Sequence, residues 1–374
     1  MKITDFIAEL HTANIDFFTG VPDSLLKPFC DYLNTTLKDS HITAQNEGGA
    51  VALAAGYHLS AGKVPCVYMQ NSGVGNAANP IISLTSPDVY GIPILYVVGW
   101  RGEPGVHDEP QHVFQGKITL ELLHLLGIET SVIDKNTSAE DVRRTLALFR
   151  GMFSQGKSAA FVVRNGTFAS DGKTIYTNDY SLSRERAIEI VTEYFKDALF
   201  VSTTGKISRE LYEIRERRGE SHVSDFLTVG SMGHSSMIAL GLALNKPDRQ
   251  VVCLDGDGAV LMHTGAFAVI GKAKPFNLIH VLLNNEAHES VGGMPNASNS
   301  VKFYKIALVC GYESGVVVGD ESELTNALGS CHFVEVKCAL NSRDDLGRPK
   351  ESPKDNKTAF ENLMRQMPLM VMPY

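Results

Sequence analysis

The pattern most suited to chemistry in this sequence is Gly256-Asp257-Gly258, which follows the apolar run Val251 to Leu254. A second apolar run, Leu278 to Leu283, ends in Asn284-Asn285. If both runs are parallel strands, the carboxylate and the amides lie at the edge where open α/β sheets bind ligands. A carboxylate with an amide carbonyl suits Mg²⁺, which shares its coordination with phosphate oxygens. Glycines and a following helix start favour close approach of a phosphate group.

The elements that must position these residues alternate regularly in both halves of the chain. Apolar runs predict strands near residues 17–18, 41–44, 64–69, 93–99 and 160–163, and near 199–202, 226–229, 251–254, 278–283 and 333–336. Helical stretches lie between them, among them 50–61, 138–153 and 259–272. Continuous apolar strands alternating with helices are typical of parallel sheets covered on both faces. The sequence therefore predicts an α/β protein with two doubly wound parallel-sheet domains.

A polar segment from Thr167 to Ser183 separates the two halves. It contains the turn formers Asp171-Gly172-Lys173 and Thr177-Asn178-Asp179, and Ser183 is a suitable N-cap for a following helix. We therefore expect one domain over residues 1–170 and another over 184–374. The polar stretch Asn341 to Lys357 is expected to form a long loop.

Composition excludes some classes of function. The chain has 374 residues, of which 44% are hydrophobic and 20% charged, and its formal net charge is −8. A general nucleic-acid or anionic-membrane binder would need a basic surface. The six cysteines form no C-x-x-C pair, and Asp5 precedes any apolar run. Buried thiols, no signal peptide and no apolar stretch of 18 residues lead us to expect a cytoplasmic protein.

The motif spacing resembles the signature of the thiamine-diphosphate-dependent enzyme family: 25 residues separate Gly258 from Asn284. The resemblance implies that Mg²⁺ on the cofactor's diphosphate is held by Asp257, Asn285 and the backbone carbonyl of Ala287. Asn284 is the one-residue alternative to Asn285. It also implies two domains of that family's fold, one binding the pyrimidine ring and one the diphosphate.

Further segments match the family in the same order along the chain. Glu47 opens a small-residue helix, where an acid is favourable in any case; its family counterpart hydrogen-bonds the aminopyrimidine N1′ and promotes loss of the C2 proton. Met232 matches the apolar side chain that wedges between the two cofactor rings. The cofactor-binding residues implied are Glu47, Thr203, Thr204, Gly205, Met232, Gly233, Gly256, Asp257, Gly258 and Asn285.

Length and three segments indicate a branch of the family. The chain has no room for the middle domain of the larger decarboxylases. The segments 19–24, 100–112 and 285–290 resemble phosphonopyruvate decarboxylases, with sulfopyruvate decarboxylases as close relatives. The latter are often split into two chains, so the fusion favours the phosphonate enzyme. The implied reaction converts 3-phosphonopyruvate into phosphonoacetaldehyde and CO₂, a step of phosphonate biosynthesis.

A small polyanionic substrate requires fixed cations and a proton donor. Asp23, His107 and His112 are candidates for proton handling, because carboxyl and imidazole groups can transfer protons near neutral pH. Candidates for substrate binding are Ser24, Arg101, Lys206, Arg209 and Arg348, although each charge is equally compatible with a solvated surface position. The resemblance also implies at least a homodimer, with each cofactor at a subunit interface.

Another class of enzyme remains open at this stage. Gly73-Val74-Gly75-Asn76-Ala77-Ala78 matches G-x-G-x-x-A, the dinucleotide fingerprint, and Arg101 follows the next strand. An NADP-dependent oxidoreductase is therefore an alternative. Against it, the match lies two strands into the fold and Pro80 follows soon after. A serine hydrolase is less favoured, since Gly233 to Met237 lacks the closing glycine of a nucleophile elbow.

Overall fold

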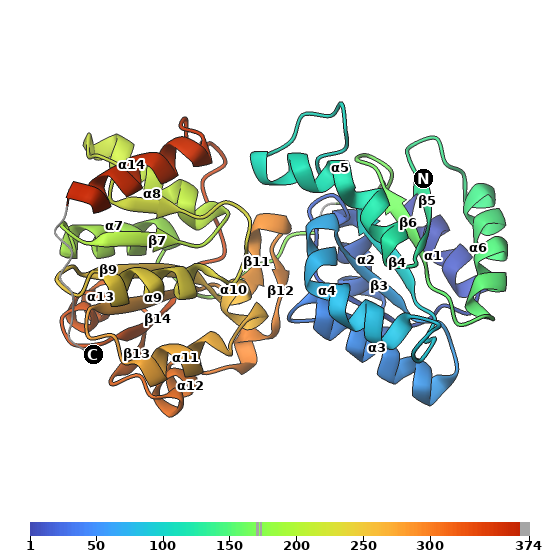
Figure 1. The fold of residues 1–374 in the computed structure, drawn as a ribbon, viewed down its shortest axis with the longest axis horizontal. Helices are drawn as coiled ribbons and strands as arrows, with labels where there is room; N and C mark the ends of the chain where they lie inside the picture. Colours follow the sequence, from blue (N-terminus) through green and yellow to red (C-terminus); the bar gives the residue numbers. More distant parts are fainter. Residues whose placement is uncertain (170–171, 173, 367–374) are drawn as a thin grey trace. The chain divides into compact units, whose positions relative to one another are not determined.

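The computed structural model describes residues 1–169, 172 and 174–366. The chain divides into two compact units, residues 1–175 and 176–374 (Figure 1). The division falls inside the polar segment 167–183, although Asp171 and Lys173 of the expected turn lie outside the described residues. No separate middle domain stands among the described residues, since the last strand of the first sheet ends at Val163 and the next helix begins at Arg184.

The N-terminal unit contains a six-stranded parallel sheet with the order β2-β1-β3-β4-β6-β5. Its strands are β1 (Phe18–Gly20), β2 (His41–Thr43), β3 (Cys66–Gln70), β4 (Leu95–Gly99), β5 (Glu129–Ile133) and β6 (Ala159–Val163). Its helices are α1 (Ile3–Thr12), α2 (Lys27–Thr36), α3 (Glu47–Ala61), α4 (Val74–Pro80), α5 (Pro110–Leu125) and α6 (Ala139–Phe153).

The C-terminal unit contains a second six-stranded parallel sheet, with the order β13-β14-β10-β9-β7-β8. Its strands are β7 (Leu199–Ser202), β8 (Asp225–Leu227), β9 (Val251–Gly256), β10 (Leu278–Asn284), β13 (Gly315–Val318) and β14 (Phe333–Lys337), and a short hairpin joins β11 (Ala287–His288) to β12 (Met294–Pro295). Its helices are α7 (Arg184–Tyr194), α8 (Lys206–Arg218), α9 (Ser235–Asn245), α10 (Asp257–Met262), α11 (Ala266–Ala273), α12 (Phe303–Cys310), α13 (Glu321–Leu328) and α14 (Pro353–Gln366).

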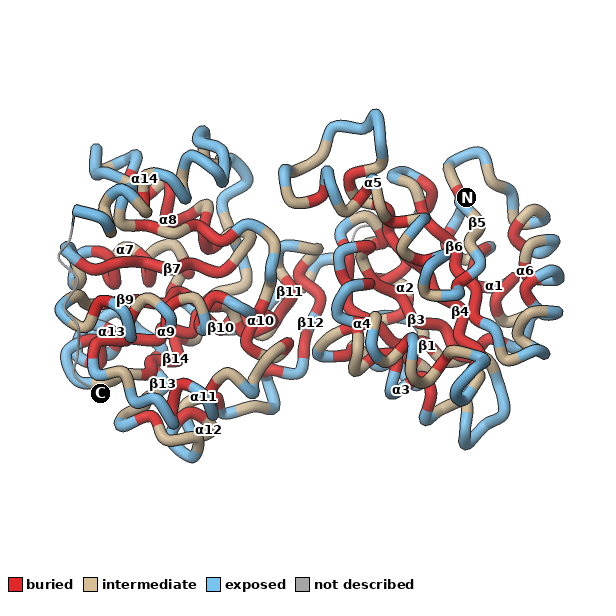
Figure 2. Tube along the Cα trace, in the orientation of Figure 1, coloured by how far each residue is buried: buried red, intermediate tan, exposed pale blue. Residues whose placement is uncertain are grey.

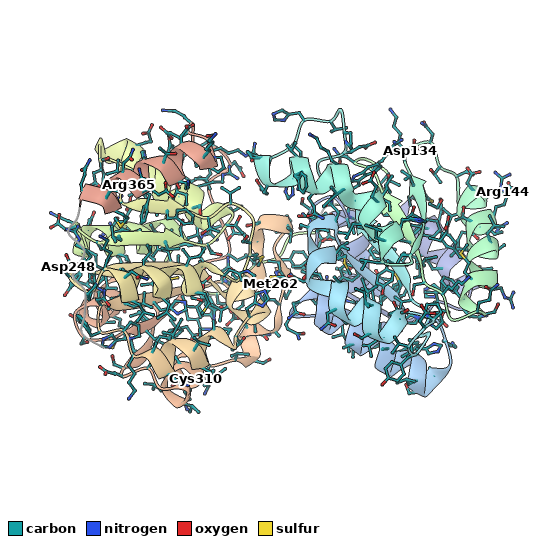
Figure 3. All side chains as sticks on the ribbon, viewed as in Figure 1. Asp134, Arg144, Asp248, Met262, Cys310 and Arg365 are labelled. Atoms are coloured by element: carbon teal, nitrogen blue, oxygen red, sulfur yellow. The ribbon has the colours of Figure 1, made fainter. Side chains whose placement is uncertain are left out.

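Helices cover both faces of each sheet, which explains the continuous apolar strands (Figure 2). In β9, Val252 and Leu254 pack with α7, α8 and α13, while Val251 and Cys253 pack with α9, α11 and α12. Because successive side chains of a strand point to opposite faces, a strand buried on both sides must be apolar throughout. Charged side chains such as Arg144, Asp248 and Arg365 lie exposed at the surface (Figure 3).

The prediction of a two-domain α/β protein is confirmed. The predicted strands omit two strands, and the bounds of one helix and one loop differ from those of the structure. Strands β5 and β13 were not predicted because both are edge strands with partly exposed residues. The single helix expected over 259–272 is wrong: α10 ends at Met262 and α11 begins at Ala266. The loop expected over 341–357 is also too long, because α14 begins at Pro353. No helix within the described ranges could cross a membrane.

Candidate active site

Glu47 lies at the start of α3, where the N-cap Asn46 accepts a hydrogen bond of 2.7 Å from the backbone N–H of Gly49. The Glu47 side chain is buried, and its Oε2 accepts a hydrogen bond of 2.8 Å from Nδ2 of Asn76. Burial raises the pKa of Glu47, and the Asn76 hydrogen bond only partly offsets this. The local environment of Glu47 therefore favours the protonated form of its carboxyl group at the start of α3.

Gly73 permits this arrangement through its missing side chain. A Cβ at Gly73 would lie 2.4 Å from Oε1 of Glu47, whereas a Cβ at Gly75 would meet no described atom within 4 Å. Both Gly73 and Asn76 belong to the segment that matches the dinucleotide fingerprint. The contact with Glu47 accounts for the first glycine of that match without a dinucleotide. Asn76 is not among the predicted site residues, although the segment 73–78 that contains it matches the dinucleotide fingerprint.

Asp23 is fully buried just beyond the end of β1. Its Oδ1 accepts a hydrogen bond of 2.7 Å from Nε2 of Gln70, while its Oδ2 has no hydrogen-bond partner among the described residues. Burial raises the pKa of Asp23, although Gln70 and the charge of Arg101 work against that rise. Gly99 allows the approach, because a Cβ there would lie 2.1 Å from Asp23 Oδ2.

Arg101 contacts Ser24, another predicted substrate-binding residue, and also Asp108. Its Nη1 donates a hydrogen bond of 2.9 Å to the Ser24 hydroxyl, and its Nε donates one of 2.7 Å to Asp108. Burial alone would raise the pKa of Asp108, but hydrogen bonds from Arg101 and two backbone N–H groups hold it well below its usual range. Asp108 is thus an ionised counter-ion for Arg101 in the segment between β4 and α5.

The two histidines of this segment differ in environment. His112 is buried in the first turn of α5, and no described residue is hydrogen-bonded to its Nδ1. Burial, together with the nearby charge of Arg101, lowers the pKa of His112. His107 is exposed in the preceding loop. The structure therefore brings Asp23, Ser24 and Arg101 to one edge of the sheet, and leaves His107 at the surface.

Asp257 begins α10, directly after β9, and is buried. Its Oδ2 accepts hydrogen bonds of 2.8 Å from both Asn296 Nδ2 and Ser298 Oγ. Burial raises the pKa of Asp257, so a bound cation would offset the cost of ionising it. Asn296 and Ser298 were not predicted, since only the turn after β12 brings them back to α10.

The adjacent residues Asn284 and Asn285 are oriented differently. Nδ2 of Asn284 donates a hydrogen bond of 2.9 Å to Glu335 on the neighbouring strand β14. Nδ2 of Asn285 donates one of 2.7 Å to Glu289, and its Oδ1 lies 3.2 Å from the backbone nitrogen of Ala287. The Asn285 amide therefore belongs to the same turn as the Ala287 carbonyl. Asn284 instead ties that turn to the sheet, because its Oδ1 accepts a hydrogen bond of 3.1 Å from the backbone N–H of Glu286.

Glycines without side chains allow the remaining loops of this unit to pack closely against one another. Gly205 has a φ of 98°, and a Cβ there would lie 2.8 Å from Oγ of Ser290. The backbone nitrogen of Gly230 donates a hydrogen bond of 3.0 Å to Thr204. A Cβ at Gly258 would lie 3.3 Å from Cε of Met232 and 3.0 Å from Nδ1 of His288, so these three residues adjoin.

Further expected cofactor residues lie on the same loops. Gly233 has a φ of 88°, and a Cβ there would lie 2.6 Å from His263. Thr203 is tied to β9 by a backbone hydrogen bond of 2.8 Å to Leu254. Gly256 ends β9 and immediately precedes Asp257. The four loops beyond β7, β8, β9 and β10 thus bring the predicted cofactor residues of this unit together.

The three predicted substrate-binding cations of the C-terminal unit are Lys206, Arg209 and Arg348. Nζ of Lys206 donates hydrogen bonds of 2.6 Å to Ser342 and 3.1 Å to Glu289. Nε of Arg209 donates one of 2.6 Å to the backbone carbonyl of Gly347. Arg348 is exposed beside it. Arg209 therefore holds the segment before α14, and Lys206 links that segment to Glu289.

This site fits a magnesium-bound diphosphate. The side chains of Asp257 and Asn285 and the carbonyl of Ala287 offer a carboxylate, an amide and a backbone oxygen on buried residues at strand ends. That all-oxygen donor set is the one preferred by hard divalent cations. Gly256 and Gly258, which flank Asp257, let the side chains of Thr203, Met232 and His288 lie close to the start of α10.

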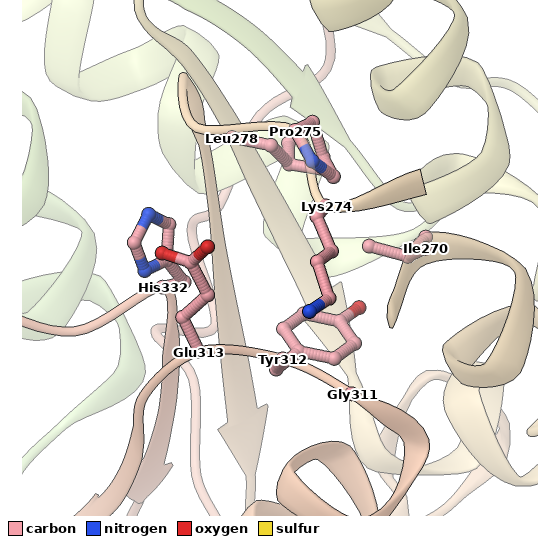
Figure 4. Close-up of a pocket in the computed structure, with 8 residues that line it drawn as sticks. All are labelled: Ile270, Lys274, Pro275, Leu278, Gly311, Tyr312, Glu313 and His332. Atoms are coloured by element: carbon pink, nitrogen blue, oxygen red, sulfur yellow. The ribbon is translucent and has the colours of Figure 1, made fainter. Parts of the chain in front are cut away.

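Two other features of this unit, a small cavity and a buried cluster of polar side chains, are formed by other residues. A cavity of about 20 Å³, the space of a single water, opens where β10 and β14 begin and is lined by Lys274, Tyr312 and His332 (Figure 4). Ligand-type atoms of Cys253, Asp255 and His280 lie within 4.8 Å of one another in the core. Neither feature includes a residue of the predicted site.

Comparison with known proteins agrees with this geometry. Residues 1–123 match the N-terminal TPP binding domain of thiamine pyrophosphate enzymes, and residues 203–336 match the C-terminal TPP binding domain. A phosphonopyruvate decarboxylase from Streptomyces viridochromogenes is 34% identical over 388 residues, covering 97% of this chain and 95% of the relative.

Two more relatives extend the comparison. A phosphonopyruvate decarboxylase from Streptomyces hygroscopicus is 34% identical, covering 95% of this chain and 92% of the relative. A sulfopyruvate decarboxylase from Methanosarcina acetivorans is 27% identical, covering 84% of this chain and 83% of the relative. The chain is therefore an enzyme of the decarboxylase class whose cofactor is thiamine diphosphate with Mg²⁺. It belongs to the thiamine pyrophosphate enzyme family, in the group of decarboxylases that includes the phosphonopyruvate decarboxylases.

Proposed function

We propose that the protein converts 3-phosphonopyruvate into phosphonoacetaldehyde and CO₂, as a step of phosphonate biosynthesis. The observation that carries this proposal is similarity to phosphonopyruvate decarboxylases over 97% of the chain, in a protein that retains a buried Glu47 and a buried Asp257. Decarboxylation of sulfopyruvate by the same mechanism is the second candidate, supported by the weaker similarity to the sulfopyruvate enzyme.

The contacts of Glu47 in one unit, and those of Asp257 and Asn285 in the other, support the cofactor-binding roles that we propose. Thiamine diphosphate, when bound, supplies a carbon nucleophile and accepts the electron pair that loss of CO₂ leaves. Asp257, Asn285 and the Ala287 carbonyl would hold Mg²⁺ on its diphosphate. Glu47, whose burial favours the protonated form, would hydrogen-bond the pyrimidine ring. The loops at Thr203 to Gly205, Met232 to Gly233 and Gly256 to Gly258 would line the rest of the cofactor.

Asp23 is our first candidate for proton transfer to the reacting carbon. Its raised pKa and its Oδ2, which has no hydrogen-bond partner among the described residues, suit a group that carries and returns a proton. His112, buried and with a lowered pKa, is the second candidate. His107 is less favoured because it is exposed.

Arg101 and Ser24 are proposed to bind the anionic end of the substrate. They already share a hydrogen bond beside Asp23, so a phosphonate bound there would lie near the proposed proton donor. Lys206 is a further candidate. Arg209 and Arg348 are weaker candidates, because Arg209 is used by the backbone at Gly347 and Arg348 is exposed.

We further propose a homo-oligomer, at least a dimer, in which Glu47 of one subunit and Asp257 of another serve one cofactor. The division of these residues between two units of the chain supports this arrangement. A cytoplasmic location is proposed on the six free cysteines, which suit a reducing compartment. Mass measurement in solution tests the assembly: a fully active monomer would refute it.

The substrate is tested by measuring aldehyde formation from phosphonopyruvate, sulfopyruvate and pyruvate, each with and without thiamine diphosphate and Mg²⁺. We expect cofactor-dependent turnover with phosphonopyruvate as the best substrate. If sulfopyruvate is turned over faster than phosphonopyruvate, the proposed mechanism stands and the proposed substrate is wrong. Absence of aldehyde from all three, in protein that binds the cofactor, would refute the proposed reaction.

A further inference from the structure

A buried group of charges surrounds the side chain of Asn285. Oε2 of Glu289 accepts a hydrogen bond of 2.7 Å from Asn285 Nδ2 and another from the guanidinium of Arg184. Oε1 of Glu289 accepts one of 3.1 Å from Lys206. Glu289 is therefore the carboxylate that connects Asn285 to two cations.

The group is balanced in charge, and its members other than Lys206 are closed to solvent. Arg184 also donates two hydrogen bonds to Glu210, so two carboxylates face the two cations. The side chains of Arg184, Glu210 and Glu289 are 5%, 2% and 9% exposed. Glu289 therefore lies between two cations that both donate hydrogen bonds to its carboxylate.

Arg184 and Lys206 can only donate hydrogen bonds, so the Glu289 carboxylate between them acts as an acceptor and selects the NH₂ end of the Asn285 amide. The NH₂ end must face Glu289, and the oxygen end must face away from it. Oδ1 of Asn285 accordingly lies on the side of the Ala287 backbone. Groups that orient a metal ligand in this way commonly change metal affinity when they are removed.

We propose that Glu289 is a positioning residue that fixes the Asn285 amide with its oxygen toward the magnesium site, with Arg184 and Lys206 holding Glu289 in place. This inference rests on the proposed role of Asn285 as a magnesium ligand. The charged cluster around Glu289 would then serve metal binding as well as the stability of the fold.

The test measures binding of thiamine diphosphate to the cofactor-free protein by calorimetry over a series of Mg²⁺ concentrations. In Glu289→Ala we expect the half-saturating Mg²⁺ concentration to rise by about 10- to 100-fold. Glu289→Gln should show a smaller rise, because its amide oxygen still accepts one hydrogen bond. Melting temperature without Mg²⁺ is recorded in parallel for every variant.

Glu210→Gln is the matched control. Glu210 is also buried and contacts the same arginine, but its hydrogen bonds within the described part of the chain do not include Asn285. It should lower the melting temperature without raising the half-saturating Mg²⁺ concentration more than about threefold. Equal rises in Glu210→Gln and Glu289→Gln would overturn the positioning role in favour of general structural damage. If Glu289→Ala does not fold, this comparison of the two glutamine variants decides the question.

Asn285→Ala separates this inference from the proposed function. If Asn285→Ala raises the half-saturating Mg²⁺ concentration while the Glu289 variants do not, the positioning role is overturned and the ligand assignment stands. If Asn285→Ala leaves Mg²⁺ dependence unchanged, the ligand assignment fails, and the positioning role fails with it.

Discussion

Nδ2 of Asn76 donates a hydrogen bond of 2.8 Å to Oε2 of Glu47, although 29 positions separate the two residues. The contact joins the start of α4 to the start of α3, two helices that follow different strands of one sheet. It occupies one carboxyl oxygen of Glu47 and leaves the other beside Gly73. The segment around Glu47 and the glycine-rich segment 73–78 therefore both serve a single carboxyl group.

Replacing Glu47 by Gln should abolish most catalysis while leaving the cofactor bound. Gln keeps the size and hydrogen-bonding ability of the side chain but cannot exchange a proton, so we expect turnover to fall by about 10²- to 10⁴-fold. Aldehyde formation and calorimetric cofactor binding measure the two effects separately. Wild-type turnover in this variant would contradict the proposed role of Glu47.

Replacing Gly73 by Ala should displace the Glu47 carboxyl group. A new Cβ would lie 2.4 Å from Oε1, so either Glu47 or the 71–73 turn must move. We expect at least a tenfold loss of turnover, because small displacements of catalytic groups reduce rates strongly.

Gly75→Ala is the control for Gly73→Ala, since no described atom lies within 4 Å of its new Cβ. As an exposed helical position it should be neutral or gain about 0.5–1 kcal/mol of stability. Comparable losses of turnover in the two variants would refute the proposed contact with Glu47.

Replacing Asp23 by Asn should change the pH dependence of stability. Because the pKa of Asp23 is raised on folding, the native state holds this proton to higher pH than the unfolded state does. Wild-type stability is therefore lost as pH rises from the unfolded pKa, about 3.9, through the higher native pKa. Asn has no such ionisation, so Asp23→Asn should gain in melting temperature relative to wild type as pH increases from 4 to 8.

The same variant tests the proton-transfer role of Asp23. Turnover of phosphonopyruvate should fall by about 10²-fold or more if this carboxyl group supplies the proton. A stable Asp23→Asn protein with normal turnover would transfer the proposed role to His112. A melting-temperature difference that does not change with pH would show that Asp23 ionises normally.

Replacing Arg101 by Gln should weaken binding of the phosphonate. A charge-assisted hydrogen bond contributes about 1.5–3 kcal/mol, which predicts an increase in KM of about 10- to 100-fold. Any turnover of pyruvate, which lacks the phosphonate, should change less. Arg143→Gln provides a control, because Arg143 pairs with Glu9 at the surface of the same unit. An unchanged KM in Arg101→Gln would exclude the proposed anion site.

The architecture could be predicted because it depends on local patterns. A strand covered on both faces is apolar along most of its length, so the sequence predicts β9 and β10 as apolar runs that Asp257 and Asn285 follow. Parallel strands place their carboxyl ends at one edge, which indicated the metal donors before any contact was known. Edge strands β5 and β13 carry no such requirement and were missed.

Only the tertiary structure decided which polar groups meet. Asn296 and Ser298 reach Asp257 because the β11–β12 hairpin folds the chain back, and no local pattern encodes that contact. The different partners of Asn284 and Asn285 depend on the register of β10 against β14 and on the turn that follows. Residue types and strand ends are properties of the sequence itself, whereas hydrogen-bond partners between loops arise only when distant segments pack together.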